Sequence, residues 1–162
     1  MAKNKEEKTN VMRVLEQKKI AYTPHSYPHE EGVAVDGVAV AQSMGFDPAV
    51  VFKTLVARGA SKQYYVFDVP VAANLDLKKA AKAVGEKSIE MIHQKELLPL
   101  TGYVHGGCSP VGMKKLFPTV IDASAENLAA MIVSAGKIGY QVQLSPGDLQ
   151  KMLPMKLCDV IK

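Results

Sequence analysis

Apolar residues recur at helical spacing in several short segments of the chain. Val11, Val14 and Leu15 fall on one face of a helix that begins after Thr9. The clearest helical segment is 77–84, which follows Asp76 as N-cap and ends at Gly85. Further helices are predicted at 38–44 before Gly45, at 93–98 up to Pro99, and at 149–153 after the capping sequence 145–148.

Runs of β-branched and aromatic residues predict strands between these helices. Residues 50–57 and 64–69 form two such runs, and the short polar segment between them predicts a hairpin. Further strands are predicted at 21–27 (an edge strand, because of Pro24), 103–105, 118–122, 131–134 and 140–144. In the last run Tyr140, Val142 and Leu144 alternate with glutamines, which predicts one buried and one wet face.

The irregular order of these elements favours one fold class. Strands and helices interleave with hairpins rather than as regular βαβ units, so we predict an α+β fold with a mixed β-sheet flanked by helices. The length of 162 residues predicts a single domain over 1–162.

Composition narrows the class of protein. Hydrophobic residues make up 48% of the chain, which excludes a disordered or collagen-like protein. No apolar run approaches the ~20 residues of a membrane span, and the charged segment 1–8 lacks the apolar core of a secretory signal. The two cysteines, Cys108 and Cys158, make no disulfide framework. We therefore expect a cytoplasmic protein with no membrane partner.

The charge is mildly basic. A net charge of +4 and a pI near 9.0 are compatible with a polyanionic partner without requiring one. Lysines gather in the middle of the chain, where they form either a phosphate-binding surface or a solvated face; they are Lys62, Lys78, Lys79, Lys82, Lys87, Lys114 and Lys115.

Two glycine-containing segments are the strongest candidates for a binding site. Residues 106–112 (GGCSPVG) and 134–139 (SAGKIG) each follow a predicted strand. Glycine leaves the backbone N–H groups uncovered, so a ligand can approach them closely. Together with Lys53, which is alone in an apolar strand, they suggest a site for an acyl or phosphate oxygen.

Side chains with possible chemistry leave alternatives open. Lys53 fits either a catalytic cation or an edge-strand lysine that prevents aggregation. Cys108 fits either a nucleophile or, better, a buried inert thiol. Thr54, Ser109 and Ser134 fit either hydroxyl contacts to a ligand or bonds to their own backbone. The four histidines have no metal-ligand spacing and no nucleotide-binding glycine motif occurs, so no metal and no cofactor are predicted.

Five ordered motifs resemble one known family. They are Phe52–Val56, Leu75–Lys82, Thr101–Tyr103, Gly106–Gly112 and Val133–Lys137. Together they resemble the YbaK/EbsC family of free-standing aminoacyl-tRNA editing proteins, which are related to the inserted editing domain of bacterial prolyl-tRNA synthetases. The resemblance runs from about Val11 to the last helix, and it is greatest to the Cys-tRNA(Pro) deacylase branch.

The resemblance implies an activity, a substrate and partners. It implies removal of cysteine from mischarged Cys-tRNA(Pro), with Cys-tRNA(Cys) as a further substrate, by attack of the substrate's own thiol and release of a thiolactone. Mischarging arises because cysteine and proline are similar in size. The chain has no recognisable tRNA-binding module, so the resemblance also implies a ternary complex with prolyl-tRNA synthetase.

The resemblance also assigns site residues. The lysine at position 53 is the family's key residue, with an electrostatic role on the 3′-terminal adenosine or the developing charge. Gly106 and Gly107 supply backbone N–H groups to the acyl oxygen. The implied substrate contacts, of which Tyr27 and Ser134 match family pocket positions, are Tyr27, Thr54, Ser109, Ser134 and Gly136.

Three positions depart from the family pattern. Ala135 stands where glycine is common, Gln141 where an acidic residue is frequent, and Cys108 where an aliphatic residue is frequent. Two other functions therefore stay open. One is a deacylase of Ala-, Ser- or Thr-tRNA that uses water as nucleophile, and the other is a non-catalytic adaptor that binds tRNA or a synthetase.

Overall fold

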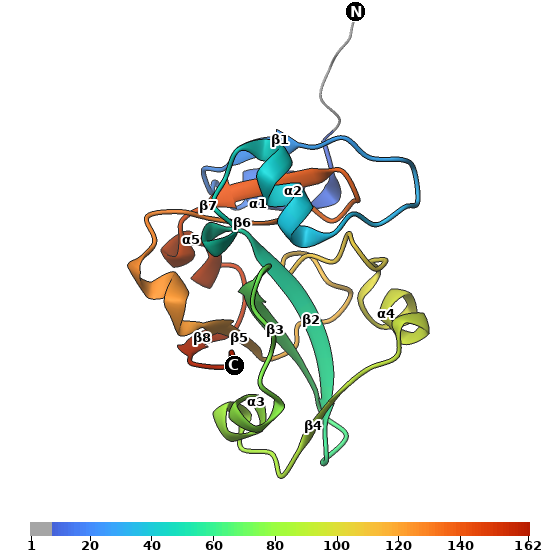
Figure 1. Ribbon diagram of the computed structural model, residues 1–162, viewed down its shortest axis with the longest axis vertical. Helices are drawn as coiled ribbons and strands as arrows, with labels where there is room; N and C mark the ends of the chain where they lie inside the picture. Colours follow the sequence, from blue (N-terminus) through green and yellow to red (C-terminus); the bar gives the residue numbers. More distant parts are fainter. Residues whose placement is uncertain (1–7) are drawn as a thin grey trace, which may run out of the picture.

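Two β-sheets organise the computed structural model, which describes residues 8–162 (Figure 1). The smaller sheet is antiparallel, with the strand order β1 (Thr23–Ser26), β7 (Tyr140–Leu144), β6 (Met131–Ser134). The larger sheet is mixed, with the order β4 (Ile89–Met91), β2 (Phe52–Gly59), β3 (Tyr64–Pro70), β5 (Thr119–Asp122), β8 (Met155–Cys158). The α+β class with a mixed sheet is thus confirmed, although the strands divide between two sheets. Segment 1–7, part of the stretch expected to carry no secretory signal, lies outside the described residues.

Strand β2 joins the two sheets. It pairs with β3 along its whole length as the predicted hairpin, from Phe52 opposite Pro70 to Arg58 opposite Tyr64. Just before it, Val51 forms a parallel bridge to Ile132 of the smaller sheet. On its other side β2 pairs with β4 only over Ala57–Gly59, so the first half of this edge has no neighbouring strand in the larger sheet. Figure 1 shows this half of β2 running up to the smaller sheet.

The predicted helix caps are confirmed at the first three helices. Helix α1 (Asn10–Gln17) begins after Thr9, whose hydroxyl accepts a bond from the Met12 N–H at 3.2 Å. Helices α2 (Gly37–Met44) and α3 (Leu77–Val84) end at glycines with left-handed φ angles of 78° and 75°. Two 3₁₀ turns are Pro48–Val50 and Ala123–Asn127.

The core has a main part between the two sheets and a second part under α3. Leu15 of α1, Phe52 of β2 and Met131 of β6 are buried together in the main part. Ala80 of α3 packs against Phe67 of β3 on the other face of the larger sheet. The larger sheet is therefore covered on both faces, which fixes the position of β2.

Local hydrogen bonds overturn two predictions near the first glycine segment. Helix α4 (Gln94–Thr101) continues past Pro99, because the Gly102 N–H caps the Leu98 carbonyl at 2.8 Å and the Thr101 hydroxyl donates to the Leu97 carbonyl at 2.7 Å. The predicted strand 103–105 is absent. The Tyr103 N–H instead donates to the Thr101 hydroxyl at 3.0 Å, so it forms no ladder bond.

Three further predictions differ from the structure at the level of elements. The predicted start of the last helix is confirmed, since the Ser145 hydroxyl accepts the Asp148 N–H at 3.0 Å and Pro146 lies in the first turn; the helix, α5, spans Pro146–Gln150 and not 149–153. Strands β4 and β8 were not predicted, because each is short and mostly exposed, so it shows no alternation of buried and exposed positions. Gln141 is buried, so the wet face predicted for 140–144 is wrong at this position.

The loop between β6 and β7 packs on α1, which generates a stability prediction. Gly136 has φ +91°, and a Cβ there would lie 2.9 Å from the Tyr103 ring and 3.0 Å from Val11. We expect Gly136→Ala to lower the free energy of unfolding by about 1–3 kcal/mol, measured by urea denaturation. The control is Gly147→Ala, where a Cβ meets nothing within 4 Å and the effect should stay within about 1 kcal/mol. Equal unfolding midpoints for the two variants would contradict this account of the loop.

Candidate active site

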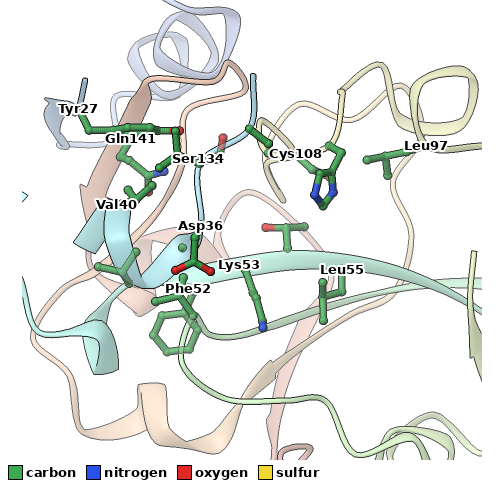
Figure 2. Close-up of a pocket in the computed structure, with 18 residues that line it drawn as sticks. Tyr27, Asp36, Val40, Phe52, Lys53, Leu55, Leu97, Cys108, Ser134 and Gln141 are labelled. Carbon is green, nitrogen blue, oxygen red and sulfur yellow. The ribbon is translucent and has the colours of Figure 1, made fainter. Parts of the chain in front are cut away.

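A cavity of about 390 Å³ opens beside the uncovered half of β2 (Figure 2). Most of its lining comes from residues 34–37 at the start of α2, residues 51–55, the loop residues His105, Gly106 and Cys108, and Ser134 with Gln141 on β6 and β7; Val40, Val71 and Leu97 complete it. Tyr27 closes the end next to Gln141. The cavity therefore lies where the smaller sheet, β2 and the first glycine segment meet.

Lys53 lies at the edge of this cavity. Figure 2 shows its side chain leaving β2 away from Ser134 and Gln141. Partial burial lowers the pKa of Lys53, and the nearby charge of Asp36 opposes that shift. Among residues 8–162 the Lys53 ammonium has no hydrogen bond and no ion pair within 4.0 Å. Its charge is consequently available to an anionic group at the cavity mouth.

Asp36, whose charge acts on Lys53, also caps a helix. Its carboxylate accepts the Ala39 N–H at 3.2 Å and so caps α2. The capping bond holds the carboxylate at the cavity, where its charge acts on the neighbouring Lys53 (Figure 2). Capping and electrostatics are combined in this one residue.

Thr54 lines the cavity on the opposite face of β2, and Asp68 lies buried beside it. They are register partners on β2 and β3, and the Thr54 hydroxyl donates to Asp68 Oδ1 at 2.5 Å. Asp68 is fully buried, and burial raises its pKa to about 7, although the bond from Thr54 opposes this shift. The bond leaves only the oxygen lone pairs of Thr54 for a ligand.

Polar groups of the smaller sheet complete the wall across from β2. Ser134 and Gln141 are register partners on β6 and β7, and both are buried. Gln141 Oε1 has no hydrogen-bond partner. Tyr27 is held by its N–H, which donates to the Gly139 carbonyl at 3.0 Å, and burial raises the pKa of its hydroxyl. This side of the cavity can accept hydrogen bonds from a ligand.

Cys108 lines the cavity but is poorly suited to act as a nucleophile. Burial, reinforced by the charge of Asp68, raises the pKa of its thiol to about 12. The thiol therefore stays protonated at neutral pH, whereas a nucleophilic cysteine needs the thiolate. His105 also lines the cavity, but no hydrogen bond joins it to Cys108 among the contacts of the described chain.

Gly106 lies in the cavity wall, whereas Gly107 does not. Gly106 has φ +90° and lines the cavity, and a Cβ there would lie 2.7 Å from that of Ala34. The Gly107 N–H donates to the Val104 carbonyl at 3.0 Å, and a Cβ at this position would lie 3.1 Å from the Ile138 nitrogen. The expectation that both glycines present N–H groups to a ligand is therefore corrected for Gly107, whose donor is already used in a turn.

Two other predicted contacts lie outside the cavity lining. The Ser109 hydroxyl is fully buried and accepts the Val111 N–H at 3.2 Å. The Gly136 N–H donates to the Ser134 hydroxyl at 3.0 Å, and the glycine packs on Tyr103. Both residues shape the loops that hold the site. Of the residues predicted to form it, the structure brings together Tyr27, Lys53, Thr54, Gly106 and Ser134.

Sequence reasoning missed Asp36, Asp68, His105 and Gln141 as residues in or behind this site. Asp68 carried a usable signal, since an acidic residue inside a run as apolar as 65–69 is rarely buried without a role. Gln141 was noted only as a departure from the family pattern, and its alternating polar position indicated a side chain that faces solvent.

Residues 8–162 contain neither a cluster of metal ligands nor a membrane-spanning helix. No three His, Cys, Asp or Glu side chains lie together so as to hold a metal ion. In the same range, no helix has the length and apolar character needed to cross a bilayer.

Comparisons with known proteins agree on one family. A family model described as "Aminoacyl-tRNA editing domain" matches residues 31–152. A relative from Enterococcus faecalis, named "Putative Cys-tRNA(Pro)/Cys-tRNA(Cys) deacylase EbsC", is 46% identical over 147 residues, which cover 90% of this chain and 89% of the relative.

Solved structures show the same fold at lower identity. The "putative trans-editing enzyme for prolyl tRNA synthetase" superposes with a TM-score of 0.79 at 23% identity and covers 94% of both chains. A protein described as hypothetical gives a TM-score of 0.82 at 19% identity, over 94% of this chain and 99% of the other. The ordered motifs, the two-sheet fold and the sequence match agree, and the chain belongs to the family of aminoacyl-tRNA editing domains.

Proposed function

We propose that this protein is a trans-editing deacylase that removes cysteine from mischarged Cys-tRNA(Pro), and from Cys-tRNA(Cys) as a second substrate. The observation that carries the proposal is the 46% identity, over 90% of the chain, to the relative named for that activity. The site adds physical support, since a cavity of about 390 Å³ has room for a small aminoacyl group. Acting on tRNA places the protein in the cytoplasm.

The reaction uses the substrate's own thiol. Its sulfur attacks the ester carbonyl carbon, the bond from that carbon to the ribose oxygen breaks, and the thiol proton ends on the leaving oxygen. The products are a cysteine thiolactone and uncharged tRNA. The raised pKa of Cys108 supports this mechanism, because the only thiol in the cavity lining within residues 8–162 stays protonated and unreactive.

Each cavity residue has a role that its position supports. Lys53 at the mouth attracts the 3′-terminal nucleotide, and the N–H of Gly106 faces the acyl oxygen as its charge develops. Tyr27, Thr54 and Ser134 contact the aminoacyl group. Prolyl-tRNA synthetase supplies recognition of the tRNA body in a ternary complex, because the aminoacyl pocket can contact only the end of the acceptor strand.

Replacement of Lys53 tests whether the chain is an enzyme at this site. We expect Lys53→Ala to reduce the single-turnover rate of Cys-tRNA(Pro) deacylation at least ~100-fold, because the partly buried positive charge at the edge of the cavity is lost. The circular dichroism spectrum of the variant should match that of the wild type. Lys87→Ala, which removes an exposed lysine before β4, is the matched control and should keep the wild-type rate. A wild-type rate in Lys53→Ala would favour the edge-strand interpretation and the non-catalytic adaptor.

A second experiment tests whether the nucleophile is the thiol of the substrate, Cys108 or water. Under the substrate-assisted mechanism Cys108→Ser keeps a near-normal rate on Cys-tRNA(Pro), and the wild type barely cleaves Ser-tRNA(Pro), whose hydroxyl is a poorer nucleophile. Quenched-flow assays with product analysis for thiolactone or free amino acid check both expectations. A folded but inactive Cys108→Ser protein would make Cys108 the nucleophile, and rapid cleavage of Ser-tRNA(Pro) would indicate water-mediated hydrolysis.

Salt dependence tests the lysine surface. Lys114 and Lys115 are exposed on the segment that follows the cavity loop, whereas Lys79 of α3 is already paired with Asp159 at 3.0 Å. We expect the apparent affinity for aminoacyl-tRNA to fall steeply between low and moderate salt, and the slope to decrease by about one for each lysine replaced at 114 and 115. Lys78→Ala on α3 is the comparison variant, and its salt slope should equal that of the wild type. If the affinity measured by filter binding does not depend on salt, Lys114 and Lys115 form only a solvent-exposed face and do not contact phosphates.

A further inference from the structure

Asp68 is a buried carboxylate that the proposed mechanism leaves without a task. It has no exposed surface, and it lies directly behind Thr54 in the cavity wall. Its Oδ1 accepts the Thr54 hydroxyl at 2.5 Å, and its Oδ2 has no partner. Within residues 8–162 only one other buried side-chain atom lacks a partner, Gln141 Oε1 across the same cavity. Burial of an unpaired carboxylate is costly, which calls for an explanation.

Among residues 8–162, no basic side chain is bonded to Asp68. On β2, Thr54 faces it and Lys53 points to the other face of the strand. On β5 its register partner is Ile121, while the next residue, Asp122, is bonded to the N–H groups of Ser124 and Val160.

The loop at 103–108 contributes the thiol of Cys108 and the phenol of Tyr103, both of which have pKa values of about 12 and stay neutral. His105, on the same loop, lines the cavity but makes no hydrogen bond to Asp68 within the described residues. Burial raises the pKa of Asp68 to about 7, and the Thr54 bond opposes that shift. Within residues 8–162 no cation is therefore bonded to Asp68, which leaves that place to a bound cation when the carboxylate ionises.

We propose, on the basis of the function proposed above, that Asp68 is a positioning residue for the free α-amino group of the aminoacyl substrate. By accepting the Thr54 proton, it turns the lone pairs of Thr54 Oγ1 toward the cavity as an acceptor for that group. Its charge draws the amino group there in the ammonium form through a low-dielectric wall.

This arrangement defines a substrate class. An aminoacyl ester with a free amino group brings a cation next to the reacting carbonyl, whereas an N-acylated ester brings a neutral amide of larger volume. The enzyme therefore selects aminoacyl-tRNA and rejects N-blocked or peptidyl-tRNA at this wall. Selection on charge is strong because a buried acceptor left without its donor costs free energy.

The selection has a predictable pH window. Asp68 must be ionised, so selection is lost as the pH falls below about 7. The α-amino group must be protonated, so selection is also lost as the pH rises above ~8. Discrimination should be greatest between these limits, which is a signature that a purely structural role of Asp68 does not produce.

The test compares Cys-tRNA(Pro) with N-acetyl-Cys-tRNA(Pro) on the wild type and on Asp68→Asn. We expect the wild type to show a KM at least ~10-fold lower for the free amine at pH 7.5. Asp68→Asn should raise that KM ~10-fold, change the KM for the N-acetyl substrate less than ~2-fold, and remove the loss of selection below pH 7. The matched control is Asp122→Asn, a second buried carboxylate away from the cavity, which should leave the ratio unchanged.

Several outcomes would overturn the proposal: equal KM values for the two substrates on the wild type, or an equal effect of Asp68→Asn on both. If Asp68→Asn does not fold, Thr54→Val and Thr54→Ser take its place, since only serine keeps the acceptor; equal selection in the two would also overturn it.

A binding measurement separates this proposal from the proposed function. Calorimetry with 3′-deoxy-3′-(L-cysteinylamino)adenosine and its N-acetyl form involves no cleavage. Tighter binding of the free amine that disappears in Asp68→Asn supports the role of Asp68 even if Cys-tRNA is not cleaved. Equal or absent binding of both compounds contradicts it, whatever the deacylation assays show.

Discussion

The incomplete pairing of β2 is the constraint on which the site depends. This strand is held on one side by β3 along its full length and on the other by β4 only over Ala57–Gly59. Just before β2, Val51 pairs with Ile132 of the smaller sheet through a parallel bridge. The gap between these two pairings is where the cavity lies, and full pairing of β2 with β4 would close it. An edge left open is normally a liability, and here the loop at 105–108 and residues 34–37 line it instead.

The alternation of side chains along β2 places different functional groups in different parts of the cavity. Adjacent residues of a strand point to opposite faces, so Lys53 and Thr54 serve different parts of the site. The Lys53 side chain lies at the edge of the cavity, and the short Thr54 hydroxyl lies on the inner wall, backed by Asp68. Burial raises the pKa of both acidic groups here: the Cys108 thiol, at about 12, stays neutral, whereas Asp68, at about 7, titrates near neutral pH.

The sequence predicts much of this architecture where the determinants are local. Thr9 and Gly85 set helix ends by bonds to residues a few positions away, so their caps could be read directly from the chain. The prediction of a strand at 103–105 was wrong, because the Tyr103 N–H donates to the Thr101 hydroxyl and is not free for a hydrogen bond to a neighbouring strand. The site is harder to predict than the helices, since Gln141 and Asp68 gain their meaning only from residues far away in sequence. Lys53 and Gly106 could be picked out by motif, but the loss of the Gly107 donor to Val104 could not.

The cavity is assembled from segments that are widely separated in the chain, from Tyr27 to Gln141. Contacts between such distant segments form slowly, because the entropy of closing long loops must be overcome before the contacts stabilise anything. The contacts within helix α3 and within the β2–β3 hairpin are local, so they do not carry this entropic cost. We therefore expect the cavity to be among the last parts of the fold to become complete.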